Sequence, residues 1–156
     1  MFIEYEYLKR CDCMVRPQKR KKYGSIAVDL DMSKEEVTIF VDGIQAAKTS
    51  FMFDGPMLRV TDVGTENGYE MNGYGRMMFD VLKNVARQHK MPIYLWSLDA
   101  AIPFYEKLGL LHLNNKEVQK RVIFANLKDT DIDKEVDEDD FVWVPKGLNG
   151  RPLIYL

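Results

Sequence analysis

The sequence predicts an α/β (α+β) domain in which a mixed, mostly antiparallel sheet carries helices on its faces. Several apolar segments of strand length come before any convincing helix, which implies an antiparallel beginning. A helical segment then separates two strand-like segments, a pattern typical of a right-handed parallel crossover. The chain of 156 residues is long enough to bury a core of its own without disulfide or metal support.

Four strands are predicted in the first half of the chain. Apolar and polar residues alternate in the first of them, as in a strand with one buried face. The second and third flank Asp42-Gly43, which favours a two-residue hairpin turn because both residue types tolerate positive φ. The dipeptide Gly55-Pro56 sets off the fourth strand. The predicted strands are residues 25–30, 36–41, 44–53 and 57–63.

The clearest helix is predicted at residues 74–90. Its apolar residues recur three or four positions apart, whereas polar residues occupy the opposite face. These apolar residues are Met78, Val81, Leu82 and Val85. Residues 93–97 follow Pro92 and have the length and composition of a short buried strand.

A second helix is predicted at residues 99–108. Asp99 can cap its first turn and Gly109 can end it. Pro103 lies inside this range and lacks a backbone N–H group. We therefore expect the helix to begin near Ala101 or to be kinked.

The last part of the chain is less regular. Residues 115–127 could form a helix with apolar residues facing inward, although residues 122–124 would also suit a strand. Three further short strands are predicted, at residues 110–113, 141–144 and 152–156.

Composition excludes several classes of protein. Hydrophobic residues make up 46% and charged residues 29% of the chain, which fits a globular domain and argues against disorder. No apolar run approaches the length of a membrane span, and charged residues near the start argue against a secretory leader. Cys11 and Cys13 cannot form a disulfide framework. We therefore expect a reduced, cytoplasmic protein that does not enter a membrane.

The net charge of −2 hides a segregation of charges. Residues 129–140, predicted to be an acidic loop, carry a net charge of −7, so the rest of the chain carries +5. Residues 16–22 hold five of the positive charges and could contact phosphate groups. Because this basic run has no interleaved aromatic residues, we expect a solvated loop there and not a nucleic-acid site.

Two arrangements partly imitate metal sites. The acids of residues 129–140 resemble a calcium loop, but Lys134 stands where glycine is needed and Asp140 where a bidentate Glu is needed. The two cysteines and two histidines lack the usual spacing of zinc ligands. They are Cys11, Cys13, His89 and His112. We therefore predict no metal site.

A glycine-containing loop precedes the first helix. Its sequence is Glu70-Met71-Asn72-Gly73-Tyr74-Gly75-Arg76-Met77. Two glycines separated by one residue allow a sharp turn in which backbone N–H groups and the helix N-terminus can face a phosphate. Met78 stands where a dinucleotide fingerprint needs a small residue, and there is no Lys-Ser/Thr pair of a P-loop. The loop is therefore a phosphate-binding candidate, with a simple turn as the alternative.

This loop, together with the segment Ala-Ile-Pro-Phe-Tyr-Glu-Lys-Leu-Gly-Leu at residues 101–110, resembles the GNAT superfamily of acyl-coenzyme A dependent N-acetyltransferases. The resemblance is strongest over residues 57–111. It implies a single GNAT-like domain over residues 1–156, with a central parallel strand pair that splays apart and helices on both faces of the sheet. It also implies acetyl-CoA as co-substrate.

The resemblance implies roles for individual residues. Backbone groups near Val63 and Thr65 would bond the pantetheine arm where the fourth strand splays from its parallel neighbour. Tyr105 would protonate the departing thiolate. Glu66, or secondly Asp62, would take the proton of the amine, although either could be a solvated loop acid. The amides that would hold the pyrophosphate are those of Gly73, Tyr74, Gly75, Arg76 and Met77.

The sequence departs from the family pattern at Glu70, where Gln or Arg is common. An acid there would repel a pyrophosphate unless its side chain points away. We expect direct transfer of an acetyl group to a primary amine of a small molecule or a protein, with a cationic acceptor favoured if residues 129–140 border the acceptor groove. The alternative is a catalytically silent GNAT-fold module that binds a protein or nucleic-acid partner. A homodimer is compatible with either function.

Overall fold

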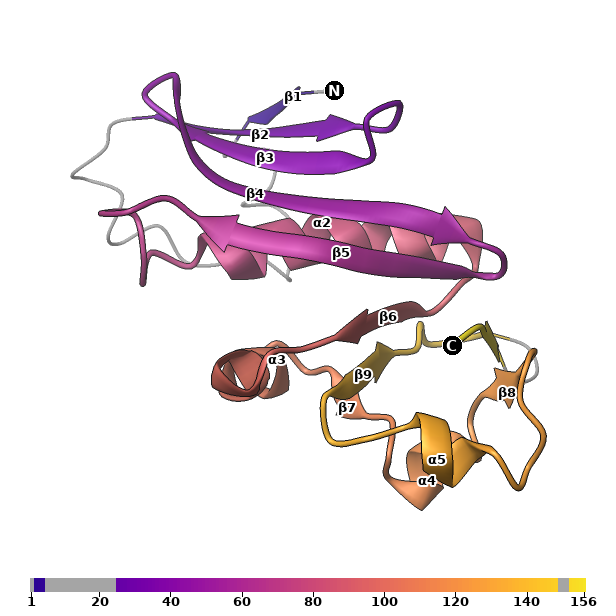
Figure 1. Cartoon of the computed structure of the whole chain (residues 1–156). Helices are drawn as coiled ribbons and strands as arrows, with labels where there is room; N and C mark the ends of the chain where they lie inside the picture. Colours follow the sequence, from indigo (N-terminus) through magenta and orange to yellow (C-terminus); the bar gives the residue numbers. More distant parts are fainter. Residues whose placement is uncertain (1, 5–24, 149–151) are drawn as a thin grey trace. The chain divides into compact units, whose positions relative to one another are not determined.

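The structure is a computed structural model that describes residues 2–4, 25–148 and 152–156 (Figure 1). The basic run at residues 16–22 lies outside the described residues, as do Cys11 and Cys13. What the sequence predicts for these residues therefore stays a prediction.

The chain divides into two compact units. The first combines Met1–Phe51 with Thr61–Asn84, and the second combines Met52–Val60 with Val85–Leu156. Because the boundaries fall inside secondary-structure elements, two strands and the longest helix contribute residues to both units. The single domain predicted over residues 1–156 stays a prediction. Among the described residues, no helix is long and apolar enough to cross a membrane.

The first unit is built on antiparallel strands that follow one another along the chain. They are β1 (Phe2–Glu4), β2 (Ile26–Asp31), β3 (Glu36–Val41), β4 (Ile44–Asp54) and β5 (Met57–Thr65). The sheet order is β1-β2-β3-β4-β5, and the pairs β1–β2, β2–β3 and β3–β4 are antiparallel. The four strands predicted in this half of the chain are thereby confirmed, with ends that differ by one or two residues.

The local signals that predicted these strands are confirmed as well. The turn between β3 and β4 has φ of +50° at Asp42 and +81° at Gly43, as the hairpin prediction requires. Alternate residues are buried along β2. The buried apolar residues of β2 and β3 are Ile26, Val28, Leu30, Val37, Ile39 and Val41.

Helix α2 (Tyr74–His89) confirms the first predicted helix. All four apolar residues whose spacing predicted it are buried. The helix ends where Lys90 takes a positive φ of +51°, and the N–H group of Met91 then donates to the carbonyl of Ala86. The periodicity of the sequence therefore identified both the helix and its buried face.

The second unit holds the parallel strand pair. The strands that join β5 in its sheet are β6 (Ile93–Trp96), β7 (Leu111–His112) and β9 (Asp140–Trp143), in the order β5-β6-β9-β7. β5 and β6 run parallel through two residue pairs, whereas β6–β9 and β7–β9 are antiparallel. Within the described residues, the last two residues of β6 pair with β9 alone. The predicted parallel pair is confirmed and is short.

The second predicted helix is split, as Pro103 led us to expect. A 3₁₀ turn, η2 (Asp99–Ala101), leads into α3 (Ile102–Lys107), and Pro103 lies in the first turn of α3, where a missing N–H group is tolerated. The prediction that Asp99 caps the helix is wrong. Leu98 occupies the N-cap position of η2 and makes no side-chain capping bond.

Residues 115–127 contain both structures that the sequence allowed. α4 (Lys116–Gln119) is one helical turn, capped by Asn115, whose side-chain oxygen accepts two backbone N–H groups of the helix. β8 (Ile123–Phe124) follows and pairs in parallel with β10 (Leu153–Ile154). The helix therefore ends before the strand-like residues begin.

The acidic segment at residues 129–140 is only partly a loop. α5 (Ile132–Glu135) forms one helical turn inside it, and Asp140 is the first residue of β9. Lys116 of α4 forms an ion pair with Asp133 of α5. The prediction of an acidic loop over the whole segment is corrected accordingly.

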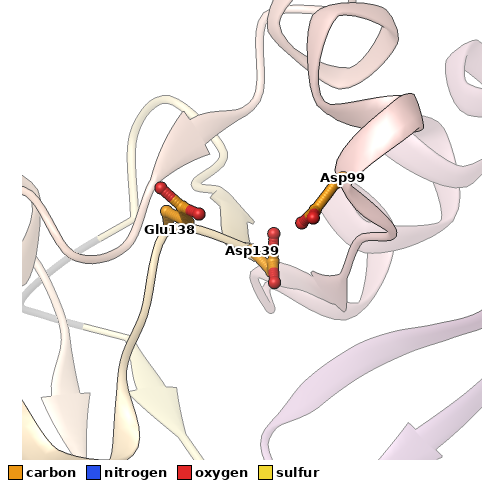
Figure 2. A group of neighbouring side chains, drawn as sticks. All are labelled: Asp99, Glu138 and Asp139. Atoms are coloured by element: carbon orange, nitrogen blue, oxygen red, sulfur yellow. The ribbon is translucent and has the colours of Figure 1, made fainter.

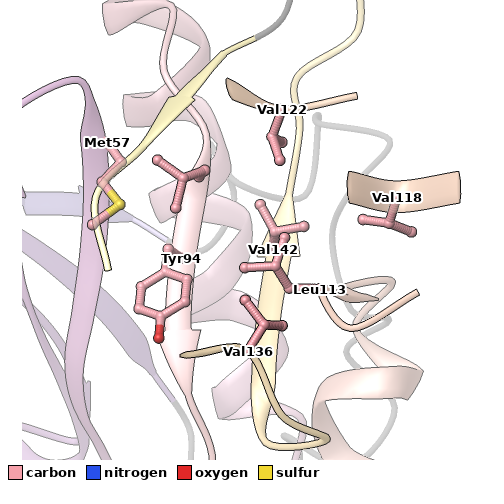
Figure 3. Packing of buried hydrophobic residues seen from close by; sticks show 8 residues of the cluster. Met57, Tyr94, Leu113, Val118, Val122, Val136 and Val142 are labelled. Carbon is pink, nitrogen blue, oxygen red and sulfur yellow. The ribbon is translucent and has the colours of Figure 1, made fainter. Parts of the chain in front are cut away.

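The core of the second unit joins elements that are far apart in the sequence (Figure 3). Strands β5, β6, β9 and β10 contribute to it, together with residues near α4 and α5. Its members are Met57, Tyr94, Leu113, Val118, Val122, Val136, Val142 and Ile154. Because Ile154 is fully buried, the short strand β10 is part of this core.

Tyr94 also belongs to a polar network. Its hydroxyl donates to the carboxylate of Asp140, whose other oxygen accepts the N–H group of Asp137 at 2.9 Å. The guanidinium of Arg59 lies 4.8 Å from the centre of the Tyr94 ring and pairs with Asp54 at 2.9 Å. Burial raises the pKa of both Tyr94 and Asp140. The network therefore holds β5, β6 and β9 together through side chains.

Candidate active site

The loop before α2 has a backbone suited to an anion. Met71 and Gly73 take positive φ values of +64° and +80°, the region that favours glycine. The helix then begins at Tyr74, and its first turn contains no acidic residue. Since the first N–H groups of a helix have no intrahelical acceptor and lie at the positive end of its dipole, this turn can receive a phosphate.

One of the predicted amide donors is already engaged. The N–H group of Met77 donates to the carbonyl of Gly73 at 3.1 Å, which is a helical hydrogen bond. The other amides that the sequence proposes as donors, those of Gly73, Tyr74, Gly75 and Arg76, stay predictions.

The Glu70 carboxylate has a hydrogen-bond partner within the loop. Its carboxylate accepts the N–H group of Gly68 at 2.8 Å. The side chain of Asn72 ties the loop together, because its amide donates to the carbonyls of Tyr69 and Glu70 at 3.0 and 2.9 Å. That Glu70 points away from a bound pyrophosphate, as the sequence analysis requires, stays a prediction.

The other candidates of the first unit lie at the end of β5. Val63 and Thr65 are in the strand and Glu66 follows it directly. The N–H group of Glu66 donates to a carbonyl of β4 at 2.8 Å, and the carbonyl of Asp62 accepts the hydroxyl of Thr49 at 2.7 Å. Glu66 and Asp62 are both exposed, so either carboxylate is in contact with water.

Tyr105 belongs to the second unit, where it lies on α3. It is 8% exposed, and its ring centre lies 5.0 Å from that of Phe104 and 5.7 Å from that of Phe141. Its carbonyl accepts the N–H group of Leu110. Tyr105 is therefore packed among aromatic rings, and it lies in a different unit from the glycine loop.

The structure brings together three acids that the sequence did not group. The carboxylate oxygens of Asp99, Glu138 and Asp139 lie within 4.8 Å of one another (Figure 2). Burial raises the pKa of Asp139, and the neighbouring Asp99 carboxyl raises it further. The pairing of β6 with β9 explains this meeting, because Asp99 follows one strand and the other two acids precede its partner. The trio could hold a cation, so the absence of a metal site stays a prediction.

Comparison with known proteins finds solved structures with a similar fold. No protein-family model matches the sequence, and no curated protein matches it. The structure of N-acetylglutamate synthase from Neisseria gonorrhoeae, complexed with coenzyme A and L-arginine, is similar with a TM-score of 0.50 and 15% identity. The match covers 76% of this chain and 24% of the synthase.

Two further structures are similar with lower TM-scores. The N-acetyltransferase YlbP of Bacillus subtilis, in complex with coenzyme A, has 22% identity and a TM-score of 0.46, over 72% of this chain and 68% of its own. Ard1 of Thermoplasma volcanium has 14% identity and a TM-score of 0.48, over 71% and 69%.

The chain has the fold of the GNAT superfamily of N-acetyltransferases. The predicted class, a mixed and mostly antiparallel sheet with a parallel pair, is confirmed. The chain spans about a quarter of the length of the synthase that it resembles. At these sequence identities, the similarity shows a shared fold and nothing further.

Proposed function

We propose that the chain is an N-acyltransferase that moves an acetyl group from acetyl-CoA to a primary amine. The observation that carries this proposal is the loop before α2. Its glycine turn and its acid-free first helical turn suit a pyrophosphate, and the Glu70 carboxylate already accepts a hydrogen bond from Gly68. A protein with this fold, N-acetylglutamate synthase, is complexed with coenzyme A.

In this proposal the cofactor is held mainly by backbone groups. The pantetheine arm would pair with the backbone near Val63 and Thr65 in the manner of an added strand. The guanidinium of Arg76, at the start of α2, would add charged donors to the pyrophosphate. The amides proposed for the pyrophosphate are those of Gly73, Tyr74, Gly75 and Arg76.

The proposed transfer is direct, within a ternary complex. The neutral amine attacks the thioester carbonyl, so that a C–N bond forms and the C–S bond breaks. Tyr105 gives its phenolic proton to the departing thiolate, which a phenol of ordinary pKa about 10 can do. The proton lost by the amine goes to Glu66, or to Asp62, through water. No covalent intermediate with the enzyme is formed.

The proposed acceptor is a cationic amine of a small molecule or a protein. The support for this choice is the acidic segment at residues 129–140, in which Asp137 and Glu138 are exposed. Asp140 does not serve this purpose, since it is buried against Tyr94. A cluster of exposed, negatively charged carboxylates attracts amines that carry additional positive charge.

Thiol release from acetyl-CoA with a panel of cationic, neutral and anionic amines tests this function. We expect turnover with cationic amines and a loss of about 100-fold in the Tyr105→Phe variant, the usual size of a general-acid contribution. The variant Asp137→Asn/Glu138→Gln should lose the preference for cations while it keeps turnover of neutral amines. A wild-type chain that turns over no amine, or that prefers anionic ones, would refute the proposal.

The alternative is a silent module that binds a partner through the same fold. The feature that favours it is the acid at position 70, although the hydrogen bond from the N–H group of Gly68 gives this carboxylate a partner within the loop. The cytoplasmic location, the homodimer and the lack of nucleic-acid binding stay predictions.

A further inference from the structure

Helix α3 carries Tyr105 but is too short to be stable by itself. It has six residues, whereas isolated helices of fewer than about 12 residues are marginal in water. The direction in which Tyr105 points must therefore be set by the residues that α3 packs against.

Phe141 is the first of these residues. It is fully buried on β9, and its ring contacts those of Tyr105 and His112, whose centres lie 5.7 and 4.5 Å from its own. His112 and Phe141 are also paired across β7 and β9. The strand register therefore fixes the surface on which the Tyr105 ring lies.

A second contact connects β7 back to α3. The Nε2 atom of His112 lies 3.1 Å from a carboxylate oxygen of Glu106, the residue next to Tyr105. The contacts form a closed ring that runs from Tyr105 to Phe141, from Phe141 to His112, and from His112 to Glu106. Two of these contacts involve α3: Tyr105 with Phe141, and Glu106 with His112. Together they restrain the rotation of α3 better than one of them alone, because turning the helix breaks both.

We infer that Phe141, His112 and Glu106 are positioning residues for Tyr105. The inference rests on the proposed function, in which the Tyr105 hydroxyl must reach the leaving sulfur. A small error in the placement of a catalytic group lowers the rate of the chemical step without changing the affinity for the cofactor. The three residues should therefore affect kcat and leave the KM for acetyl-CoA unchanged.

Steady-state kinetics of single and double variants test this inference. Glu106→Ala and His112→Ala should each lower kcat by about threefold, the size expected of one half-exposed hydrogen bond. The double variant should lose no more than His112→Ala alone, since that variant already removes the contact with Glu106. Glu106→Gln should keep the wild-type kcat, because its amide can still bond Nε2. Phe141→Leu should lower kcat by about tenfold.

Additive losses in the double variant, or a higher KM for acetyl-CoA at constant kcat, would overturn the inference. The matched control is Glu117→Ala, which removes an ion pair with Lys120 at 3.0 Å elsewhere in the same unit. Its kcat should equal that of the wild type.

A spectroscopic arm separates this inference from the proposed function. In a chain with isotope-labelled tyrosine rings, Glu106→Ala should shift the NMR signal of Tyr105, identified by its loss in Tyr105→Phe, and leave the signal of Tyr94 in place. An unmoved Tyr105 signal would overturn the positioning role whether or not the chain is active. A shifted signal in a chain without turnover would instead refute the proposed function.

Discussion

Asp140 is an acid that the fold keeps away from water. It is 3% exposed, the hydroxyl of Tyr94 donates to it, and it also accepts the N–H group of Asp137. Burial raises its pKa above the ordinary value of 3.8, so the folded state binds this proton more tightly than the unfolded state. The stability that results is full below the unfolded pKa and is lost as the pH rises through the folded pKa.

We predict that Asp140→Asn removes this dependence of stability on pH. The difference in free energy of unfolding, wild type minus variant, should fall as the pH is raised from about 4 to about 7, because only the wild type gives up the proton. Urea unfolding at the two pH values measures it, with Asp129→Asn at an exposed acid as control. A difference that stays constant or grows with pH would contradict the account of Asp140.

Single residues were predictable from the sequence where their role is local. Gly73 has the positive φ that a sharp turn needs, as a Gly-x-Gly sequence before a helix indicates. Asp99 and Asp139 were not grouped, because they are 40 positions apart and meet only through the pairing of β6 with β9. Likewise, no local pattern shows that the side chain of Glu70 bonds the N–H group of Gly68.

Among the elements, length decided what the sequence could predict. Helix α2 has 16 residues and therefore several apolar repeats. Helices α4 and α5 have four residues each, fewer than are needed to show a helical period. Helices this short depend on caps and tertiary contacts, such as the side chain of Asn115 and the burial of Val118 in the case of α4.

The turn between β4 and β5 leads to a prediction at this scale. Gly55 has φ of +57°, and a Cβ atom there would lie 2.5 Å from the ring of Tyr155. Gly55→Ala should therefore lower the free energy of unfolding by more than about 1 kcal/mol, the usual cost of placing alanine at a positive φ. Thermal or urea unfolding measures the loss.

The matched control is Gly43→Ala in the other hairpin. Gly43 has φ of +81°, but a Cβ atom there would meet nothing within 4 Å, so only the backbone cost of about 1 kcal/mol applies. Adding Tyr155→Ala to Gly55→Ala should remove the excess loss. Equal losses for the two glycine variants would show that the Tyr155 contact has no effect.

For the whole molecule, the order of elements predicted the fold better than the site. Strands before helices, followed by a strand-helix-strand unit, led to a mixed sheet with a parallel pair, and the structure has both. The candidate residues are divided between the units: the glycine loop and the end of β5 lie in the first, Tyr105 and residues 129–140 in the second. Such a division follows from long-range packing, which residue spacing does not encode.

The central claim is that the loop before α2 binds the pyrophosphate of acetyl-CoA. Calorimetric titration of acetyl-CoA into the wild-type chain, Gly75→Asp and Gly75→Asn tests it directly. An acid in the first turn is compatible with the helix but repels a phosphate, whereas asparagine has the same size without the charge. We predict one bound acetyl-CoA per wild-type chain and an affinity at least about tenfold weaker for Gly75→Asp than for Gly75→Asn. No binding by the wild type, or equal affinities for the two variants, would contradict the claim.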